Sequence, residues 1–199
     1  MRIAVFCSGN GTNLQAIIDA VKRRSIRACL ALVVADNPDA YALTRATRAG
    51  IRTFVLTKEG FPTREAYDAA VIKELKKEKI DLVVLAGFMR LLSARFVRQY
   101  RNRILNIHPS LLPAFKGAHG IDDALAYGVK VTGVTVHVVD EGLDSGPIVL
   151  QVAIPVGAKD TEATLAARIH RQEHILYPRA IKLFVERKLK ITGRKVFIT

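Results

Sequence analysis

The stretch RIAVFCSGNGTNLQAIIDAV, residues 2–21, decides the fold of this chain. Its first six residues form a β-rich apolar run, Ser8–Asn13 form a loop with two glycines, and apolar residues from Leu14 onward recur at helical spacing. A strand, a glycine loop and a helix in this order predict a βα unit. The amino end of such a helix directs free N–H groups at the loop, which favours the binding of a phosphate.

The loop Ser8–Asn13 does not match the common nucleotide-binding motifs in full. No Gly-Lys-Ser/Thr follows it, so it is not a Walker loop. Gly9 and Gly11 fit the dinucleotide pattern GxGxxG, but Leu14 stands at the third glycine. Asp36 follows the next apolar run, where NAD enzymes hold a ribose hydroxyl, so these residues alone leave a nicotinamide-dependent oxidoreductase open. An ordinary turn with a helix cap is the structural alternative, and two glycines directly after the first strand favour phosphate binding over it.

Apolar runs alternate with helical segments through about residue 130, which predicts an α/β fold. We expect a Rossmann-like, mostly parallel twisted sheet with helices on both faces and an antiparallel region in the C-terminal part. The expected parallel strands are residues 2–7, 28–35, 52–56, 81–86 and 103–107. The expected helices begin near residues 14, 62, 93 and 122.

The C-terminal part predicts a different pattern. Residues 131–139 alternate in polarity and 147–154 form another apolar run, so we expect an antiparallel pair joined by an acidic loop. Asp160 and Thr161 are expected to cap a long helix, and residues 189–199 a small hairpin. No internal repeat or linker separates the chain into independent domains.

Two motifs carry the chemistry: NIHPSLLP at residues 106–113 and DEGLDSGP at residues 140–147. An amide such as Asn106 can hold a developing oxyanion, and an imidazole such as His108 exchanges a proton near neutral pH. A carboxylate such as Asp144 orients the imidazole and favours its protonated form. Taken singly, His108 starts a turn and Asp144 caps another, but together these groups suit the transfer of an acyl group.

All the candidates follow the ends of expected strands. The glycine loop, the segment Met89–Leu92 and the pair Asn106 and His108 therefore share the carboxyl edge of the sheet, where α/β proteins bind ligands. An apolar loop with one arginine, such as Met89–Leu92, can clasp a flat heterocycle; the alternative is that it packs the next helix.

Four further residues have both a functional and a structural interpretation. Arg64 lies in the first turn of a helix, where its charge opposes the helix dipole, which makes it a candidate to bind an anion; the alternative is a surface arginine. Glu173 is expected to be exposed, with cation binding as the alternative. His119 is either a second site histidine or a loop histidine that faces water. His137 is either a catalytic histidine or a hydrogen-bonded structural histidine, and we predict the structural one.

The formal net charge of +13 requires a nucleic-acid partner to be considered. Basic residues are scattered along the expected helices without a basic tail, which indicates a solvated positive surface that attracts small anions. No run approaches the roughly 20 apolar residues of a membrane span. Cys7 and Cys29 lie in or beside apolar runs, so we expect buried free thiols in a reducing cytosol. No zinc-like spacing occurs, and no metal site is expected.

The motifs together resemble the phosphoribosylglycinamide formyltransferases, the folate-dependent formyl-transferring family of purine synthesis. They are SGNGTNLQ at residues 8–15, GFMR at 87–90, NIHPSLLP at 106–113 and LDSGPI at 143–148. The resemblance covers nearly the whole chain, and chain length and motif order agree with it. It implies a single formyltransferase domain, 1–199, with a nucleotide-binding half (1–100) and a catalytic and folate-binding half (101–199).

The same resemblance implies the reaction and the residues that perform it. A formyl group would pass from 10-formyltetrahydrofolate to the amine of 5'-phosphoribosylglycinamide, in the synthesis of IMP. Asn106, His108 and Asp144 would be the catalytic set. The ribonucleotide would be held by Gly11, Thr12, Asn13 and Glu173. The folate would be held by Arg64, Met89, Arg90, Leu91, Leu92, Asn106, Asp140, Glu141, Gly142 and Leu143. Ala118 departs from the small hydroxyl residue expected there, which bears on a minor substrate contact.

Related families give the alternatives. Methionyl-tRNA formyltransferases share the Ser-Leu-Leu-Pro region, and a basic chain would suit tRNA, but they resemble a longer chain with a C-terminal RNA-binding domain. Formyltetrahydrofolate hydrolases carry an N-terminal regulatory domain. A nicotinamide oxidoreductase would need glycine at Leu14, and a nucleic-acid-binding module would need no catalytic set. We therefore expect a cytoplasmic monomer or homodimer that acts on small molecules, without nucleic-acid or membrane partners.

Overall fold

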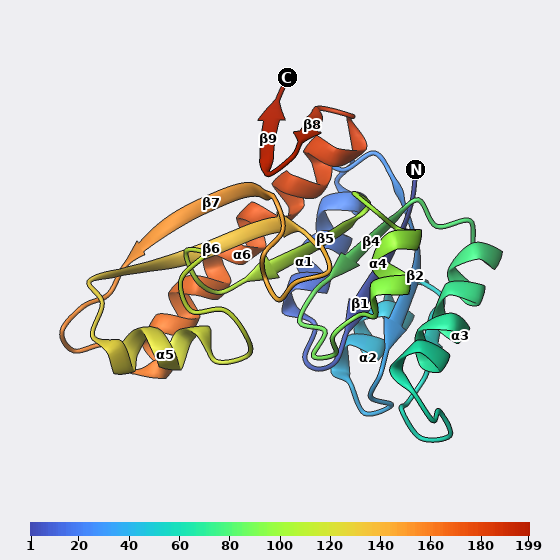
Figure 1. The fold of residues 1–199 in the computed structure, drawn as a ribbon, viewed down its shortest axis with the longest axis horizontal. Coiled ribbons are helices and arrows are strands. Elements are labelled where there is room, and N and C mark those ends of the chain that lie inside the picture. The colour runs from blue at the N-terminus through green and yellow to red at the C-terminus, as the bar shows by residue number, and fades with distance from the viewer. The chain divides into compact units, whose positions relative to one another are not determined.

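The computed structural model of this chain describes all 199 residues, which form two compact units, Met1–Leu105 (unit 1) and Asn106–Thr199 (unit 2). Unit 1 contains β1 (Arg2–Cys7), α1 (Thr12–Lys22), β2 (Cys29–Ala35), α2 (Tyr41–Arg48), β3 (Thr53–Val55), α3 (Arg64–Lys77), β4 (Leu82–Leu85) and α4 (Ala94–Gln99) (Figure 1). Strand β5 (Ile104–His108) begins in unit 1 and ends in unit 2. Unit 2 contains α5 (Gly120–Tyr127), β6 (Val131–Val138), β7 (Ile148–Pro155), α6 (Glu162–Val185), β8 (Leu189–Thr192) and β9 (Lys195–Ile198).

The strands are hydrogen-bonded in the order β3-β2-β1-β4-β5-β6-β7, and β8 and β9 form a pair of their own. In unit 1, β1 pairs in parallel with β2 and β4, and β2 pairs in parallel with β3. Residues Ile3–Cys7 of the central strand β1 are all buried, as in a parallel strand that is covered on both faces. The predicted α/β fold with a mostly parallel sheet is confirmed.

Helices cover both faces of the unit 1 sheet (Figure 1). The chain moves outward from β1 to β3 through α1 and α2, and returns from β3 to β4 through α3. Because parallel crossovers are right-handed, the outward and returning crossovers place their helices on opposite faces. In agreement, α1 packs on α2 while α3 packs on α4. The reversal makes the loops after β1 and β4 neighbours at the carboxyl edge, where such sheets bind ligands.

Unit 2 is built on the antiparallel pair β6 and β7, in which Val131 lies opposite Pro155 and Val136 opposite Leu150. Helix α6 packs against both strands and against α5. The register shifts between Val136 and His137, a local irregularity of the kind that changes where side chains point. The antiparallel region and the terminal hairpin expected from the sequence are confirmed.

Two predicted helix starts are also confirmed. The Ser93 hydroxyl accepts a 3.3 Å hydrogen bond from the N–H of Phe96 at the start of α4. At the start of α6, the hydroxyls of Thr161 and Thr164 each accept a hydrogen bond from the other residue's N–H, which forms a capping box. Local capping chemistry therefore placed these elements correctly.

Two expectations differ from the structure. No helix is expected from the sequence at residues 41–48, where α2 lies. Its N-cap residue, Ala40, offers no side-chain acceptor, and the first turn lacks an acidic residue, so the usual start signals are absent.

Cys7 is buried, and burial raises the pKa of its thiol to about 12. The predicted burial of Cys29 is wrong, because this residue lies at the exposed amino end of β2.

Candidate active site

The glycine loop, Ser8–Asn13, joins β1 to α1 in unit 1. Gly11 is the N-cap residue of α1 with φ of 73°, a left-handed conformation that glycine adopts without strain. A Cβ atom added to Gly11 would lie 2.8 Å from the Cβ of Ala42 on α2, so no side chain fits there. Glycine has no side chain, so Gly11 cannot accept hydrogen bonds from the first N–H groups of α1 as a usual N-cap residue does. The amino end of this helix therefore suits the binding of an anion.

Thr12 and Asn13 are the first two residues of α1. Asn13 is buried, with 9% of its surface exposed, while Thr12 is half-buried. The structure therefore brings Gly11, Thr12 and Asn13, predicted to bind a phosphate, into one turn of chain.

Ser8 connects the glycine loop to the Met89 loop, which we define as Gly87–Leu92. The Ser8 N–H donates to the carbonyl oxygen of Gly87 at 3.0 Å, and the Ser8 hydroxyl accepts from the N–H of Met89 at 2.9 Å. Sequence reasoning gave no role to this side chain, and its position at a strand end was the only signal. The two loops predicted to bind different substrates are thus fixed side by side.

The Met89 loop exposes apolar side chains at the carboxyl edge of β4. Met89 and Leu91 are 72% and 59% exposed, and Leu92 is half-buried. The Arg90 guanidinium lies 4.1 Å from the centroid of the Tyr67 ring, a cation–π contact that orients this side chain. Such a loop offers exposed apolar side chains beside one oriented cation, a combination that suits a flat heterocycle.

Arg64 begins α3, next to Thr63, whose hydroxyl caps the helix by accepting from the N–H of Ala66 at 3.1 Å. The Arg64 side chain is 48% exposed, and its Nε lies 4.0 Å from a carboxylate oxygen of Glu65. An exposed pair of this length is weak. The anion-binding function predicted for Arg64 stays a prediction.

In unit 2, the structure brings Asn106, His108 and Asp144 together. Asn106 and His108 lie two residues apart on β5, so their side chains share one face, and Asp144 ends the acidic loop, Asp140–Asp144. His108 Nδ1 lies 3.5 Å from Asp144 Oδ2, and Asn106 Nδ2 lies 3.5 Å from Asp144 Oδ1. One carboxylate thus faces both the amide and the imidazole.

Asp144 is held in its ionised form. Burial acts to raise its pKa, but hydrogen bonds from His137 and from the N–H of Gly117, together with electrostatic interactions with His108 and His137, outweigh burial. The pKa of Asp144 therefore lies below its ordinary value. The Gly117 N–H donates to Oδ2 at 2.9 Å.

His108 is 3% exposed, and both of its ring nitrogens face oxygen atoms. Nε2 lies 2.7 Å from the carbonyl oxygen of Phe115, and Nδ1 lies 3.5 Å from the carboxylate of Asp144. Neither oxygen can donate a hydrogen bond, and a neutral imidazole has only one N–H group. Both ring nitrogens of His108 therefore face hydrogen-bond acceptors.

His137 joins the same group of side chains. Its Nε2 lies 3.1 Å from Asn106 Nδ2 and 3.5 Å from Asp144 Oδ1, and its Nδ1 lies 3.1 Å from the carbonyl oxygen of Val138. The predicted hydrogen bonding is confirmed, but the position beside Asn106 was missed. The available signal was a polar residue on the strand face opposite the valines. Asn106, His108, His137 and Asp144 are named the amide–imidazole cluster below.

The acidic loop is shaped by its first residue. Asp140 Oδ1 accepts from the Ser145 hydroxyl at 2.6 Å and from the Gly142 N–H at 3.2 Å. Glu141 and Leu143 are exposed, Leu143 by 49%. The turn therefore directs an apolar side chain outward beside Asp144.

Glu173 is 4% exposed, so the expectation of an exposed glutamate is wrong. It lies four residues after Ile169 and three before Leu176, on the buried face of α6. Its Oε2 lies 3.0 Å from Nδ1 of His170. This hydrogen bond and the charge of Glu173 raise the pKa of His170, against a smaller opposing effect of burial.

His119 is the N-cap residue of α5, and its side chain is 75% exposed. Its Nδ1 lies 4.0 Å from a carboxylate oxygen of Asp122. Of the two alternatives from the sequence, the structure shows the histidine that faces water.

Comparison with known proteins decides the family. The model of the Formyl transferase family matches residues 1–181. The chain belongs to the formyl transferase family. It is 48% identical over 191 residues to the phosphoribosylglycinamide formyltransferase of Escherichia coli (strain K12), an alignment that covers 96% of this chain and 90% of the relative.

Two further comparisons agree with this. The chain is 48% identical over 186 residues, 92% of its length, to the trifunctional purine biosynthetic protein adenosine-3 of Drosophila melanogaster, of which it spans only 14%. The crystal structure of glycinamide ribonucleotide transformylase 1 from Symbiobacterium toebii superimposes with a TM-score of 0.98 at 49% identity, covering 100% of this chain and 93% of that chain.

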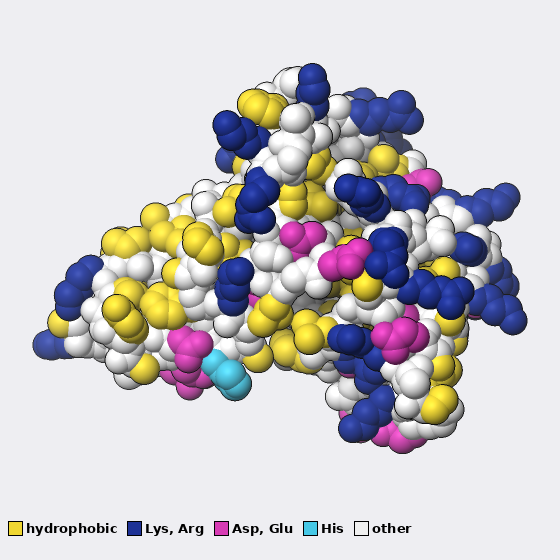
Figure 2. Space-filling view, in the orientation of Figure 1, with side chains coloured by type: hydrophobic (Ala, Val, Ile, Leu, Met, Phe, Trp, Pro, Cys, Tyr) yellow, Lys and Arg dark blue, Asp and Glu magenta, His cyan; other side chains and the backbone are white.

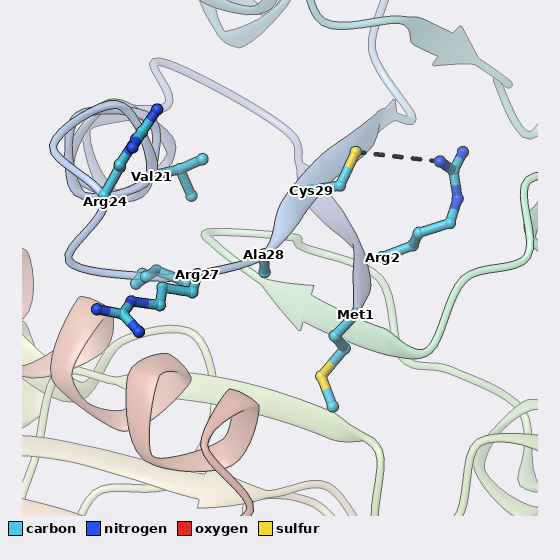
Figure 3. Close-up of a pocket in the computed structure, with 8 residues that line it drawn as sticks. Met1, Arg2, Val21, Arg24, Arg27, Ala28 and Cys29 are labelled. Carbon is cyan, nitrogen blue, oxygen red and sulfur yellow. Dashed lines mark hydrogen bonds between the residues drawn. The ribbon is translucent and has the colours of Figure 1, made fainter.

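This formyl transferase also has a cavity of about 640 Å³ away from these residues, at the amino ends of β1 and β2. Its lining includes Arg2, Arg24, Arg27 and Cys29 (Figure 3). The three arginine side chains point in different directions, and Arg2 Nη1 lies 4.0 Å from Cys29 Sγ. Because the guanidinium groups do not converge, they do not form a common anion site.

Charge is spread over the surface of this formyl transferase. Figure 2 shows Lys and Arg side chains on many elements of one face rather than in a single stripe. No group of three or more His, Cys, Asp or Glu side chains is arranged to hold a metal ion. None of the helices is both long and apolar enough to span a membrane.

Proposed function

We propose that this chain transfers a formyl group from 10-formyltetrahydrofolate to the amine of 5'-phosphoribosylglycinamide, which gives 5'-phosphoribosyl-N-formylglycinamide in purine biosynthesis. Family membership supports formyl transfer, and the names of the relatives support this acceptor. The observation that carries the chemistry is the amide–imidazole cluster, in which one carboxylate lies 3.5 Å from both Asn106 and His108.

Asn106 and His108 are proposed to stabilise the charge that develops on the formyl oxygen. The Asn106 N–H near Asp144 is 3.5 Å from its acceptor, longer than a good hydrogen bond, so it can turn to a stronger acceptor. The cationic ring of His108 adds positive charge in a buried setting, where electrostatic stabilisation is large. Asp144 faces this ring as a carboxylate, because hydrogen bonds from His137 and from the Gly117 N–H hold its pKa below the ordinary value.

The proton balance of the reaction is simple. A new N–C bond forms between the substrate amine and the formyl carbon, and the bond from that carbon to N10 of the folate breaks. The amine's proton passes to N10, through His108 itself or through a water molecule. No net oxidation or reduction occurs, so no further co-reactant is needed.

Unit 1 supplies the proposed phosphate site for the ribonucleotide. Gly11, Thr12 and Asn13 share one turn at the uncapped amino end of α1, which supports phosphate binding. Glu173 is proposed to hold the ribose hydroxyls, since a carboxylate is a strong acceptor and His170 fixes it at 3.0 Å.

The folate is proposed to bind at the Met89 loop and the acidic loop, with Arg64 as a further contact. In unit 1, the exposed apolar side chains of Met89 and Leu91 suit contact with a flat heterocycle. In unit 2, Leu143 offers a further exposed apolar side chain. Arg90 offers a cation that Tyr67 orients. When bound, the folate supplies the formyl carbon and a nitrogen leaving group. The full set of proposed contacts is Arg64, Met89, Arg90, Leu91, Leu92, Asn106, Asp140, Glu141, Gly142 and Leu143.

A methionyl-tRNA acceptor is not favoured, because the relatives compared above are named for purine biosynthesis or for the glycinamide ribonucleotide. We propose a cytoplasmic enzyme that acts on small molecules as a monomer or homodimer.

A spectrophotometric assay tests the proposal, with a formyl-folate analogue whose absorbance changes when the formyl group leaves. Three arms contain phosphoribosylglycinamide, methionyl-tRNA or no acceptor. Turnover in the first arm alone is expected. Faster turnover with methionyl-tRNA, or equal turnover without an acceptor, would overturn the assignment and indicate a tRNA formyltransferase or a hydrolase.

A further inference from the structure

We propose that Arg45 is a positioning residue, which holds the glycine loop in its ligand-binding shape from outside the loop. The inference rests on the proposed function, in which this loop binds the phosphate of the ribonucleotide. Arg45 lies on α2, the helix that the sequence did not reveal, and all of its contacts described below are within unit 1.

Arg45 donates two hydrogen bonds to Asn10, the residue between the two glycines of the loop. Its Nε donates to the carbonyl oxygen of Asn10 at 2.9 Å, and its Nη2 donates to the side-chain oxygen of Asn10 at 2.9 Å. The planar guanidinium thus uses two parallel N–H groups on one residue, which fixes its backbone and its side chain together. Asn10 is exposed and follows Gly9, a residue type with wide backbone freedom. Without the two hydrogen bonds from Arg45, Asn10 would therefore adopt several conformations.

The same guanidinium also reaches the helix that the loop starts. Nη1 of Arg45 donates to the side-chain oxygen of Gln15 at 3.2 Å, and the Gln15 amide nitrogen donates to Asp19 at 2.9 Å. The Tyr41 ring lies 4.9 Å from the guanidinium and supports it from one side. Arg45 therefore ties the loop to the first turns of α1.

Helix α2 contacts three successive loop residues. The Ala42 N–H donates to the carbonyl oxygen of Gly9 at 3.1 Å, Arg45 holds Asn10, and the backbone of Gly11 packs so closely on Ala42 that a Cβ would collide at 2.8 Å. A phosphate site made of backbone N–H groups needs those groups fixed before the ligand arrives, since ordering them on binding lowers affinity. Arg45 supplies the side-chain hydrogen bonds of this contact.

The test compares Arg45→Gln and Arg45→Lys with Arg48→Gln. Arg48 lies on the same helix, carries the same charge and donates to the Tyr41 hydroxyl at 3.3 Å, so its variant is a matched control. For Arg45→Gln we expect the KM for phosphoribosylglycinamide to rise by about tenfold or more, with kcat and the KM for the formyl folate nearly unchanged. The KM of Arg45→Lys should lie between those of the wild type and Arg45→Gln, because an ammonium keeps the charge but cannot donate the two parallel hydrogen bonds of a guanidinium.

Two further readouts separate positioning from charge and from folding. At 1 M salt, where charges more than about 3 Å apart are screened, the ratio of KM values between Arg45→Gln and wild type should persist. Amide hydrogen exchange of residues 8–14 should quicken in Arg45→Gln and not in Arg48→Gln, at a temperature where circular dichroism shows both folded. Equal KM and equal exchange in these two variants, or a ratio that vanishes at high salt, would overturn the proposal.

The exchange experiment also stands without turnover. Inorganic phosphate should slow exchange of residues 8–14 in the wild type and in Arg48→Gln, and do so more weakly in Arg45→Gln. If the wild type does not formylate phosphoribosylglycinamide, the proposed function fails while this comparison still decides whether Arg45 holds the loop.

Discussion

The glycine loop of unit 1 and the amide–imidazole cluster of unit 2 are held in place by different kinds of contact. In the loop, the proposed binding groups are backbone N–H groups at the start of α1, and their positions depend on the φ angle of Gly11 and on α2 behind it. In the cluster, the proposed reactive groups are side chains that contact one another, with Asp144 facing Asn106, His108 and His137 at 3.5 Å.

This difference predicts how each region responds to substitution. A side-chain change in the cluster removes a reacting group and should lower turnover. In the loop, a side-chain change removes no binding group, but it displaces the backbone and should weaken binding of the phosphorylated substrate. Kinetics that separate kcat from KM therefore test the comparison directly.

The largest effect is expected for His108→Ala. Loss of a positioned acid–base group typically lowers kcat by about 10²–10⁴-fold, and here it also removes the positive charge beside Asp144. His119→Ala is the matched control, because that histidine is 75% exposed and should change kcat little. Stopped-flow or steady-state assays measure both. Near-normal turnover of His108→Ala in a folded protein would refute the assignment.

The next effect is expected for Asn106→Ala. Removal of one oxyanion donor typically costs about 2.7–4 kcal/mol of activation free energy, or about 10²–10³-fold in kcat. The KM values for both substrates should change far less, because the amide acts mainly in the transition state. Steady-state kinetics with each substrate varied in turn would show this, and a raised KM with unchanged kcat would contradict it.

Gly11→Ala should affect the other region through binding. Both Gly11 and Gly50 have positive φ, 73° and 69°, so alanine at either position costs about 1–2 kcal/mol in backbone strain. Only at Gly11 would the new Cβ collide with Ala42, whereas nothing lies within 4 Å at Gly50. Urea unfolding should show a lower free energy of unfolding for both variants. A KM for phosphoribosylglycinamide raised by about tenfold is expected for Gly11→Ala alone.

An equal KM increase in Gly50→Ala would mean that strain anywhere in unit 1 disturbs the site, and that close packing on α2 is not the cause.

The smallest effect concerns the pH dependence of stability in unit 2. Glu173 raises the pKa of His170 in the folded protein above its ordinary value of 6.5. The pair therefore stabilises the fold fully below pH 6.5, and this contribution is lost as the pH rises through the raised pKa. His170→Gln should lower the melting temperature slightly in acid and not in alkali. His119→Gln, at an exposed position, should show no such trend. If His170→Gln lowered the melting temperature equally at every pH, the proposed stabilisation by the protonated His170–Glu173 pair would be contradicted.

Several parts of the fold were predictable because their signals are local. Apolar runs predicted β1, β2, β4 and the β6–β7 pair, and hydroxyl residues predicted the caps at Ser93 and Thr161. The grouping of Asn106, His108 and Asp144 was predictable from a strand end and a loop with the right chemistry. Their proximity in the structure agrees with that prediction, while their catalytic function stays a proposal.

Other features had no local signal. Helix α2 starts without a capping residue, so its eight residues were not assigned. Glu173 is buried because it lies on the inner face of α6, although a charged glutamate is usually expected to be exposed. Cys29 is exposed because it is the first residue of β2, at the exposed amino end of the strand, although its neighbours are apolar. In each case, the environment comes from residues that are distant in sequence.

The sequence by itself determined the alternation of strands and helices, the glycine loop after β1 and the amide, imidazole and carboxylate at strand ends, because periodicity, turn residues and side-chain chemistry act over a few neighbouring residues. The tertiary structure alone decided that His137 completes the cluster and that Arg45 holds the glycine loop from α2. Hydrogen bonds between residues 106 and 137, or between 10 and 45, exist only after the chain has packed, and no short stretch of sequence encodes them.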